Sequence, residues 1–501
     1  MKEAKNNYDV IIIGAGVVGC AIARELSRLQ LKIAVLEKEA DVGWGASCRN
    51  SGVVHAGYNN IPGTLMARFC VEGNEGFEDL CTELDVPYRR IGKLVVADSP
   101  EEMPALERLR AQGEKNGVRD LEIIDGDRIR ELEPHLENAW AAMYSPNSAI
   151  TSPYQLTIAL AENSLANSVD FFLDSPVSGI KNGSPEGAES GFVVSAGERN
   201  FHTRLLVNSA GVHSAEISAM AGVDDYRIYP CRGEYYVLDT YAGKLINHLV
   251  YPVPKPGSGG LGIHLTPTVD GNILIGPSNE YMDNPEDYSV TSSVMKNLSR
   301  EAKGYMSQMN GRLYIRNFAG MRAKQAPPEE GGFYDYIIRE EDSRPGLINL
   351  IGIESPGLTA SMPIARYVSG IVKTVFERMG SEVRTKLEFE GARKGPIRFS
   401  EQSDDVKAAL IESDPDYGEI ICRCEQVTKK EILQAIENPL GARSLISIKY
   451  RSRAMMGRCQ GGYCTQRILQ ILRDEYGYSP EDIKLGNDGS WLLSGRRYDN
   501  T

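Results

Sequence analysis

The stretch GAGVVG, residues 14–19, constrains the fold more than any other part of this sequence, because its surroundings complete a known pattern. A short apolar run, DVIII, precedes it without alternation, as in a strand buried on both faces of a parallel sheet. CAIARELSRLQ continues it with apolar residues at helical spacing, and Glu37 ends a second apolar run, IAVLE. This order of strand, glycine turn, helix, strand and acidic residue predicts a dinucleotide-binding βαβ unit.

Each residue of this pattern has a chemical reason. Gly14 allows the tight turn, Gly16 lets the backbone approach a pyrophosphate, and Gly19 lets helix and strand pack closely. The amides at the helix N-terminus then face the phosphate charge. We expect Glu37 to accept hydrogen bonds from a ribose hydroxyl.

Three further segments bear on which dinucleotide binds. WGASCRNSGVVHAG begins at Trp44, VNSAGVHS adds a second glycine turn near Asn208, and GIESPGLTAS follows a late strand at Ile351. Together with GAGVVG they resemble the FAD-dependent amine and hydroxy-acid oxidoreductases, the D-amino-acid oxidase-like group, over roughly residues 8–378. The resemblance implies FAD as cofactor and an α/β fold, a Rossmann-like FAD-binding domain with an inserted α+β substrate domain.

Apolar patterning and this resemblance together predict the domain boundaries. The FAD-dependent oxidoreductase domain is expected over 1–378, with FAD-binding segments at about 1–80, 145–220 and 345–378 and a substrate domain at about 81–144 and 221–344. A charged linker is expected at 379–417, a small helical iron–sulfur domain at 418–478, and a tail at 479–501.

Two branches of the group compete for the substrate assignment. Six segments together are similar to L-2-hydroxyglutarate dehydrogenases: RNSGVVHAGYNNIPGTLMARFCVEG, YPCRGEYYVL, YPVPKPG, GIHLTPTVDGNILIGP, FAGMRAK and IESPGLTAS. The domain plan resembles the A subunit of anaerobic glycerol-3-phosphate dehydrogenase. We therefore rank a small 2-hydroxy acid first, glycerol 3-phosphate second and amino acids third. A subunit that holds FAD for assembly without turnover is the alternative of another class.

Oxidation of a CH–OH group by flavin needs a base for the hydroxyl proton and a cation for an anionic substrate. The resemblance places His55 and His264 beside the flavin and substrate. It also places Arg322, which can grip a carboxylate or phosphate with two hydrogen bonds, over the ring, with Lys324 assisting. Arg232 and Tyr251 are weaker candidates.

The resemblance also implies a set of FAD contacts. Besides the residues named above, these are Ser47, Asn50, Ser51, Val177, Ala210, Gly211, Gly352, Gly357, Leu358 and Thr359.

Four of the nine cysteines are clustered near the C-terminus as C-x-C and C-x4-C. Zinc sites usually use C-x2-C pairs, whereas four thiolates also suit a [2Fe-2S] cluster, and plain structural thiols are a third reading. CRCEQVTKKEI and SRAMMGRCQGGYC resemble the bacterioferritin-associated-ferredoxin-like [2Fe-2S] domain over about 419–472. That resemblance implies a cluster bound by Cys422, Cys424, Cys459 and Cys464.

Composition limits the partners. A formal charge of -13 over 501 residues argues against a general nucleic-acid binder, which needs a basic surface. No apolar run approaches the roughly 20 residues that cross a bilayer, and the N-terminus lacks a signal core, so a cytoplasmic location is expected. The related domain plans imply a second flavoprotein or electron-transfer subunit as partner.

Overall fold

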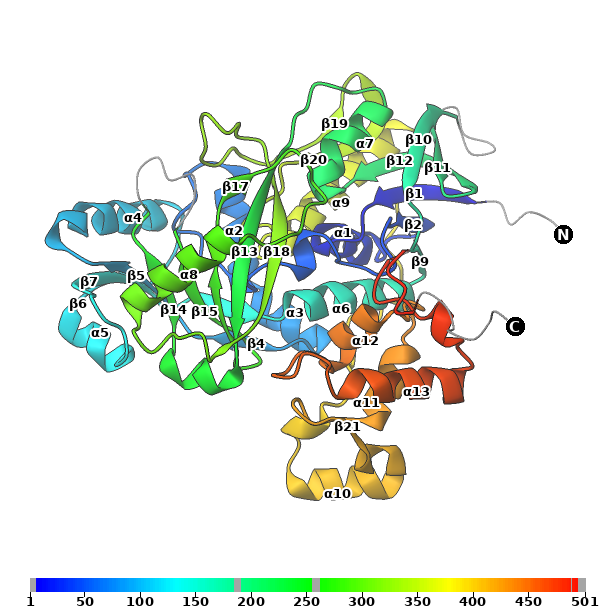
Figure 1. Ribbon diagram of the computed structural model, residues 1–501. Helices are drawn as coiled ribbons and strands as arrows, with labels where there is room; N and C mark the ends of the chain where they lie inside the picture. The colour runs from blue at the N-terminus through cyan, green and yellow to red at the C-terminus, as the bar shows by residue number, and fades with distance from the viewer. Residues whose placement is uncertain (1–5, 184–190, 255–261, 488, 494–501) are drawn as a thin grey trace. The chain divides into compact units, whose positions relative to one another are not determined.

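The strand predicted before Gly14 is β1, and it lies inside an eight-stranded sheet of the computed structural model (Figure 1). The structure describes residues 6–183, 191–254, 262–487 and 489–493. Residues 255–257 of the YPVPKPG motif and the last residues of the predicted tail lie outside these ranges. The chain divides into two units, one with residues 1–38 and 42–393 and the other with 39–41 and 394–501.

The eight-stranded sheet has a parallel centre, in which β20, β12, β1, β2 and β9 are neighbours, and antiparallel additions at one side. Its strands are β1 (Asn7–Ile13), β2 (Ile33–Leu36), β9 (Val169–Phe172), β10 (Val177–Asn182), β11 (Phe192–Ala196), β12 (Arg199–Asn208), β19 (Ile337–Glu341) and β20 (Arg344–Ile351). Val10, Ile11 and Ile12 are fully buried, as expected of a strand covered on both faces. The Rossmann-like, α/β prediction is confirmed.

Helices pack on this sheet and on one another. They are α1 (Val17–Leu26), α2 (Leu65–Glu75), α3 (Phe77–Leu84), α6 (Pro153–Ala166), α7 (Ser214–Met220) and α9 (Ser361–Arg378). Gly14 has a φ of 96°, and a Cβ at Gly19 would lie 2.0 Å from the Gly14 carbonyl oxygen. Only glycine therefore permits both the turn and the close contact between strand and helix.

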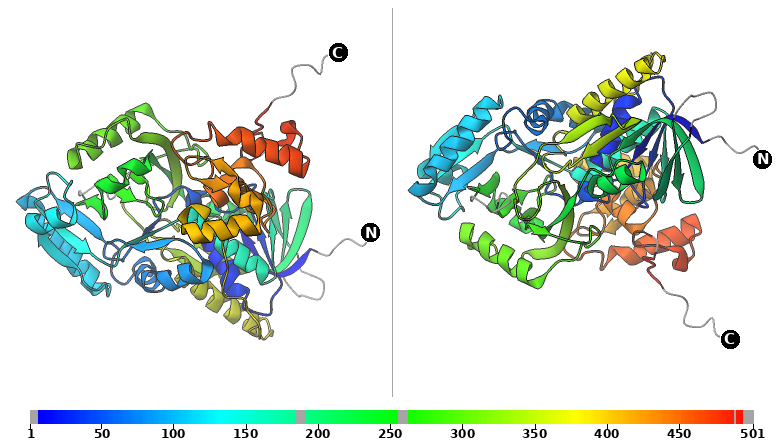
Figure 2. Two further views of the ribbon diagram at one scale, coloured as in Figure 1. Left: turned by 90° about the horizontal axis from the view of Figure 1, so that it is seen from below. Right: turned by 90° about the horizontal axis from the view of Figure 1, so that it is seen from above.

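The substrate domain is built on a nine-stranded mixed sheet. Its strands are β5 (Lys93–Ala97), β6 (Glu122–Asp125), β7 (Ala141–Ser145), β13 (Tyr229–Leu238), β14 (Leu249–Pro252), β15 (His264–Pro267), β16 (Ile273–Gly276), β17 (Glu280–Tyr281) and β18 (Tyr314–Lys324). Helices α4 (Met103–Lys115), α5 (Gly126–Leu132) and α8 (Ser292–Tyr305) accompany it. The long strands β13 and β18 run side by side in Figure 1, and within this unit α4 and α5 lie at the opposite end from β10 and β11 (Figure 2).

A small sheet links the two halves of the first unit. It consists of β3 (Val53–Val54), β4 (Tyr88–Arg90) and β8 (Ala149–Thr151), in the order β3-β8-β4. β3 immediately precedes His55, so this sheet sets the path of the WGASCRNSGVVHAG segment.

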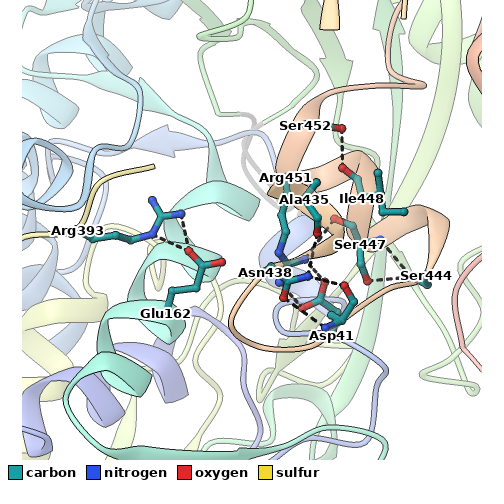
Figure 3. Close-up of polar contacts among 11 residues, drawn as sticks. Asp41, Glu162, Arg393, Ala435, Asn438, Ser444, Ser447, Ile448, Arg451 and Ser452 are labelled. Atoms are coloured by element: carbon teal, nitrogen blue, oxygen red, sulfur yellow. Dashed lines mark hydrogen bonds and ion pairs between the residues drawn. The ribbon is translucent and has the colours of Figure 1, made fainter. Parts of the chain in front are cut away.

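Two predicted boundaries need correction. The third FAD-binding segment begins with β19 rather than at residue 345, because the hairpin β19–β20 hydrogen-bonds within the first sheet. The predicted linker is divided between the units. Residues 379–393 lie along the first unit through backbone hydrogen bonds such as Lys386 N to Arg28 O at 2.7 Å, and Arg393 pairs with Glu162 at 2.6 Å (Figure 3). Backbone hydrogen bonds and single ion pairs do not require apolar residues at regular spacing, so the sequence pattern did not reveal that this segment is ordered.

The second unit is helical, as predicted. It contains α10 (Asp404–Ser413), β21 (Ile420–Cys422), β22 (Val427–Thr428), α11 (Lys429–Ile436), α12 (Leu445–Ser452) and α13 (Cys464–Tyr476). The predicted capping box is confirmed: Thr428 caps α11, and Glu431 bonds back to the Thr428 backbone. The described part of the predicted tail belongs to this unit, since Ile483 is buried in its core. No described helix is long and apolar enough to cross a membrane.

Candidate active site and cluster site

The glycine turn after β1 is tied to the neighbouring predicted FAD segments. The Val17 amide donates to Ser47 Oγ at 2.9 Å, and the Ala15 amide donates to Glu37 Oε2 at 2.7 Å. A Cβ at Gly14 would lie 2.8 Å from the Ser209 carbonyl oxygen, so the turn before Ala210 packs directly on it. Amides at the start of α1 and a buried carboxylate after β2 are the groups that a dinucleotide requires, and the residues present fit FAD.

The remaining predicted FAD residues occupy distinct places. Asn50 donates to the carbonyl oxygens of Ala46 and Ser47, so its side chain holds its own loop. Thr359 Oγ1 accepts the backbone N–H of His55 at 3.0 Å, which joins the third segment to the loop after β3. Val177 begins β10, two residues after Ser175, whose amide donates to the Glu37 carbonyl oxygen. Gly211 and Gly352 have φ values of 59° and 71°, whereas Gly357 and Leu358 lie in the turn before α9.

The two predicted histidines are brought together. His264 opens β15, and its ring stacks on the Tyr251 ring of β14 with centroids 3.4 Å apart. His55 Nδ1 lies 3.3 Å from Lys93 Nζ, and His55 Nε2 lies 3.4 Å from Ser355 Oγ. Burial, together with Lys93 and His264, holds the pKa of His55 well below its usual value. A neutral imidazole at pH 7 can accept a proton, as a general base must.

Arg322 lies across β13, and its guanidinium is held by neutral groups within the described residues. Nη2 donates to the Ser278 carbonyl oxygen at 2.8 Å, and Nη1 donates to Asn279 Oδ1 at 3.2 Å and contacts Cys231 Sγ. A Cβ at Gly233 would lie 2.6 Å from Nη2, so glycine leaves the space that the guanidinium fills. Among the residues described, no carboxylate forms a hydrogen bond or ion pair with this guanidinium, although Glu354 lies near enough to interact with its charge, and this arrangement suits the binding of an anion.

Lys324 has a different environment from the one expected of it. Its side chain is 1% exposed, and Nζ donates to the Gly332 carbonyl oxygen at 2.6 Å and pairs with Glu354 at 3.4 Å. Burial raises the pKa of Glu354 to about 7, although Lys324 and Arg322 act against the shift. Residues two apart on a strand face the same side, so Lys324 shares a face of β18 with Arg322, but its ammonium is engaged in an internal ion pair with Glu354. Its assistance to Arg322 in binding an anion stays a prediction.

The two weaker candidates also separate. Arg232 pairs with Glu280 at 2.8 Å, Asp287 at 3.0 Å and Glu234 at 3.4 Å, and it is 2% exposed. Because its charge is already paired, we expect Arg232 to stabilise the substrate-domain sheet rather than to bind a ligand. Tyr251 stays at the site, since it stacks on His264.

Sequence reasoning missed Lys93. This residue begins β5, is 1% exposed, and lies with its ammonium 4.1 Å from the Tyr251 ring centroid. With His55, Tyr58 and Tyr251 it lines a small pocket that is partly open to solvent. A single charge inside the apolar run KLVVA was the signal that could have identified it, because an unpaired charge is rarely buried without a function.

The four clustered cysteines meet in two pairs, Cys422 with Cys464 and Cys424 with Cys459, and each thiol of the first pair is buried. Backbone amides donate to the sulfurs; those of Glu425 and Met455, with Cys464, lower the pKa of Cys422. Within the described residues no three His, Cys, Asp or Glu side chains converge on one metal position. Two pairs suit two irons with two thiolates each, so the residues fit a [2Fe-2S] cluster.

Comparison with known proteins agrees with both sites. Residues 9–371 match the family model described as FAD dependent oxidoreductase, and residues 420–474 match the model described as BFD-like [2Fe-2S] binding domain. The chain belongs to the FAD dependent oxidoreductase family. As a member of this family with an appended cluster domain, it is a flavoprotein whose cofactors are FAD and a [2Fe-2S] cluster.

Several members of this family are similar over long stretches. A glycerol 3-phosphate dehydrogenase of Caloramator mitchellensis is 38% identical over 489 residues, which cover 97% of this chain and 98% of the relative. The mitochondrial L-2-hydroxyglutarate dehydrogenase of Caenorhabditis elegans is 31% identical and covers 72% of this chain and 92% of its own.

Among solved structures, the dithionite-reduced L-alpha-glycerophosphate oxidase of Mycoplasma pneumoniae with FAD bound has a TM-score of 0.70 at 26% identity. The match covers 78% of this chain and 99% of the oxidase. Glycine oxidase of Geobacillus kaustophilus, at 22% identity and a TM-score of 0.65, shares the fold.

Proposed function

We propose that this flavoprotein is a glycerol 3-phosphate dehydrogenase that oxidises the secondary hydroxyl of its substrate to a ketone. The observation that supports this most is the similarity to a glycerol 3-phosphate dehydrogenase over 97% of the chain, cluster region included. The sequence motifs had ranked a 2-hydroxy acid first. The L-2-hydroxyglutarate relative covers only 72% of the chain, so we now place glycerol 3-phosphate ahead of it.

The geometry supports a division of labour among the side chains. FAD, when bound, supplies the hydride acceptor for this reaction class. His55, kept neutral by its surroundings, would accept the hydroxyl proton at Nε2, the nitrogen beside Ser355. Arg322, whose guanidinium contacts only neutral groups among the described residues, would hold the phosphate with charge-assisted hydrogen bonds. His264, stacked on Tyr251, would fix the position of the substrate over this site.

The route by which electrons leave is a second part of the proposal. Cys424 and Cys459 are exposed, so one edge of the cluster site reaches the surface of its own unit. We propose that the cluster passes electrons to a partner subunit or other protein acceptor that docks there.

Anaerobic flavin reduction tests the proposed substrate. Glycerol 3-phosphate should bleach the oxidised flavin absorbance of the holoprotein, and L-2-hydroxyglutarate and proline, at the same concentration, should bleach it far more slowly. Faster bleaching by L-2-hydroxyglutarate would reverse the order. If no member of the panel bleaches the flavin, the protein holds FAD for assembly without turnover.

A further inference from the structure

Lys93 is a buried lysine with aromatic and imidazole neighbours in place of an acidic partner. Its Nζ lies 4.1 Å from the Tyr251 ring centroid and 5.5 Å from that of Tyr58, and 3.3 Å from His55 Nδ1. Within the part of the chain that the structure describes, no carboxylate pairs with this ammonium. Burial without an acidic partner favours the neutral amine over the ammonium, and so lowers the pKa of a lysine.

The groups that face this lysine are His55 and Tyr58 after β3, Cys70 on α2 and Tyr251 on β14. His264 on β15 stacks on Tyr251 and acts electrostatically on His55. Burial lowers the pKa of Lys93 to about 7, and only the Cys70 thiol acts in the opposite direction. Near neutral pH the amine is therefore close to its midpoint, where it can both accept and release a proton.

The protonation of Lys93 decides which nitrogen of His55 carries hydrogen. An ammonium donates to Nδ1, which leaves the neutral imidazole with its proton on Nε2, where it cannot act as a base toward the substrate. A neutral amine accepts from Nδ1–H instead, and Nε2 is then open to receive a proton. The 3.3 Å contact thus links the two groups.

We propose that Lys93 is the proton relay behind His55: it sets the base-competent tautomer and passes the substrate proton on to solvent. This inference rests on the proposed function, in which His55 is the base. As His55 Nε2 takes the hydroxyl proton, the Nδ1 proton moves to Lys93 Nζ. The C–H electron pair leaves the substrate as a hydride for the flavin, and the Lys93 ammonium releases one proton to water.

The pocket supplies the exit for that proton. Its lining includes Lys93, His55, Asn59 and Asn60, and it is partly open to solvent. Water in this pocket can therefore reach Nζ. The Tyr251 and Tyr58 rings stabilise the transient ammonium by cation–π contact.

Two substitutions separate a relay from a simple positive charge. Lys93→Met keeps the length of the side chain but has no basic group, and Lys93→Arg keeps the charge but cannot give up its proton. A relay predicts that both variants lower kcat on the order of 10- to 100-fold with KM little changed. It also predicts that the rise of kcat through about pH 7 in the wild type disappears in both. Normal kcat in Lys93→Arg, with a raised KM in Lys93→Met, would make Lys93 a substrate-binding cation and overturn the relay.

A second measurement does not depend on turnover, and it keeps the relay distinguishable from the substrate assignment. Side-chain ¹⁵N spectra of the FAD-loaded protein, with the His55 signals assigned from His55→Gln, report the tautomer directly. We expect a change from Nε2–H to Nδ1–H as pH rises through about 7 in the wild type, and Nε2–H at every pH in Lys93→Arg. A wild-type tautomer that stays the same from pH 5.5 to 9 contradicts the relay, whichever substrate bleaches the flavin.

Discussion

Two cations on β18, Arg322 and Lys324, illustrate how much a residue's role depends on the partners of its charged group. The Arg322 guanidinium contacts neutral groups and lies over Gly233, whereas Lys324 is enclosed with Glu354. Both belong to the same short motif, FAGMRAK, and the motif alone suggested one shared role. The two residues share a face of the strand, so their different partners distinguish them: the surroundings of Arg322 suit an anionic ligand, and those of Lys324 form an internal ion pair.

Arg322→Ala should raise the KM for glycerol 3-phosphate by roughly 10- to 100-fold, since charge-assisted hydrogen bonds each contribute about 1.5–3 kcal/mol. The KM of Arg322→Lys should lie between those of the wild type and of Arg322→Ala, because a lysine keeps the charge but cannot form the paired hydrogen bonds of a guanidinium. Steady-state kinetics with FAD content measured in parallel will check this. The exposed Arg312→Ala is the matched control, and unchanged kinetics in Arg322→Ala would remove Arg322 from the site.

Lys324→Met should destabilise the first unit by about 3–5 kcal/mol, because it leaves the Glu354 carboxyl buried without its cation. The double variant Lys324→Met with Glu354→Gln should recover most of that loss, since no buried charge remains. The temperature at which flavin is released on heating will measure the stability of the single and the double variant. A fall in kcat with unchanged melting in Lys324→Met would restore the catalytic role that the sequence had indicated.

The same pair predicts a pH dependence. The folded pKa of Glu354, about 7, lies above its ordinary value, so the folded state holds a proton that the unfolded chain has lost. Its contribution to stability is therefore fully present below about pH 4.5 and is lost as pH rises through about 7. Lys324→Met should accordingly melt higher at pH 5.5 than at pH 7.5, compared with the double variant at the same two values.

At the scale of elements, sequence patterns predicted those features that depend on interactions between residues close together in the chain. The βαβ unit and the capping box of α11 were predicted because glycine geometry and capping act within a few residues. The β19–β20 hairpin and the path of residues 379–393 could not be predicted, because long-range backbone pairing orders them. The surroundings of Lys93 also could not be predicted, because Tyr251 and His55, which contact it, lie on other elements.

A buried ion pair holds a short segment within the second unit. Arg451 of α12 contacts both carboxylate oxygens of Asp41 at 2.5 and 3.0 Å, and their side chains are 3% and 1% exposed (Figure 3). Asp41 belongs to this unit, with Glu39 and Ala40, although it lies far away in the sequence. Sequence patterning gave no sign of this pair, because each partner is an ordinary charged residue in its own segment.

Arg451→Met should lower the temperature at which the cluster absorbance is lost, because removing one partner of a buried ion pair, here the cation beside Asp41, costs about 3–5 kcal/mol. Adding Asp41→Asn should restore most of the difference. Arg443→Met, on the exposed surface of the same unit, is the control and should leave the transition unchanged. Equal transitions in Arg451→Met and the control would show that the pair contributes nothing measurable.

At the scale of the whole molecule, each unit has its own hydrophobic core. The clusters packed on the two large sheets draw on residues between Tyr8 and Ile351, and the cluster around the four cysteines draws on residues between Ile421 and Leu492. The composite plan, an FAD domain followed by a cluster domain, was predictable because each has its own motif spacing. The substrate was not, since Arg322 suits carboxylate and phosphate alike.

Separate cores imply that the two cofactors can be lost separately. Cys424→Ser removes one thiolate at the exposed edge of the cluster site and should abolish the cluster, as iron and acid-labile sulfide assays will show. FAD content and anaerobic bleaching by glycerol 3-phosphate should persist, because His55, the proposed base, and Arg322, the proposed anion-binding residue, lie in the other unit. Turnover with a protein acceptor should fall, whereas turnover with a small dye that oxidises the flavin directly should remain. Full activity with the protein acceptor in a cluster-free variant would give the cluster a structural role, and loss of FAD would show that the two units depend on each other for folding.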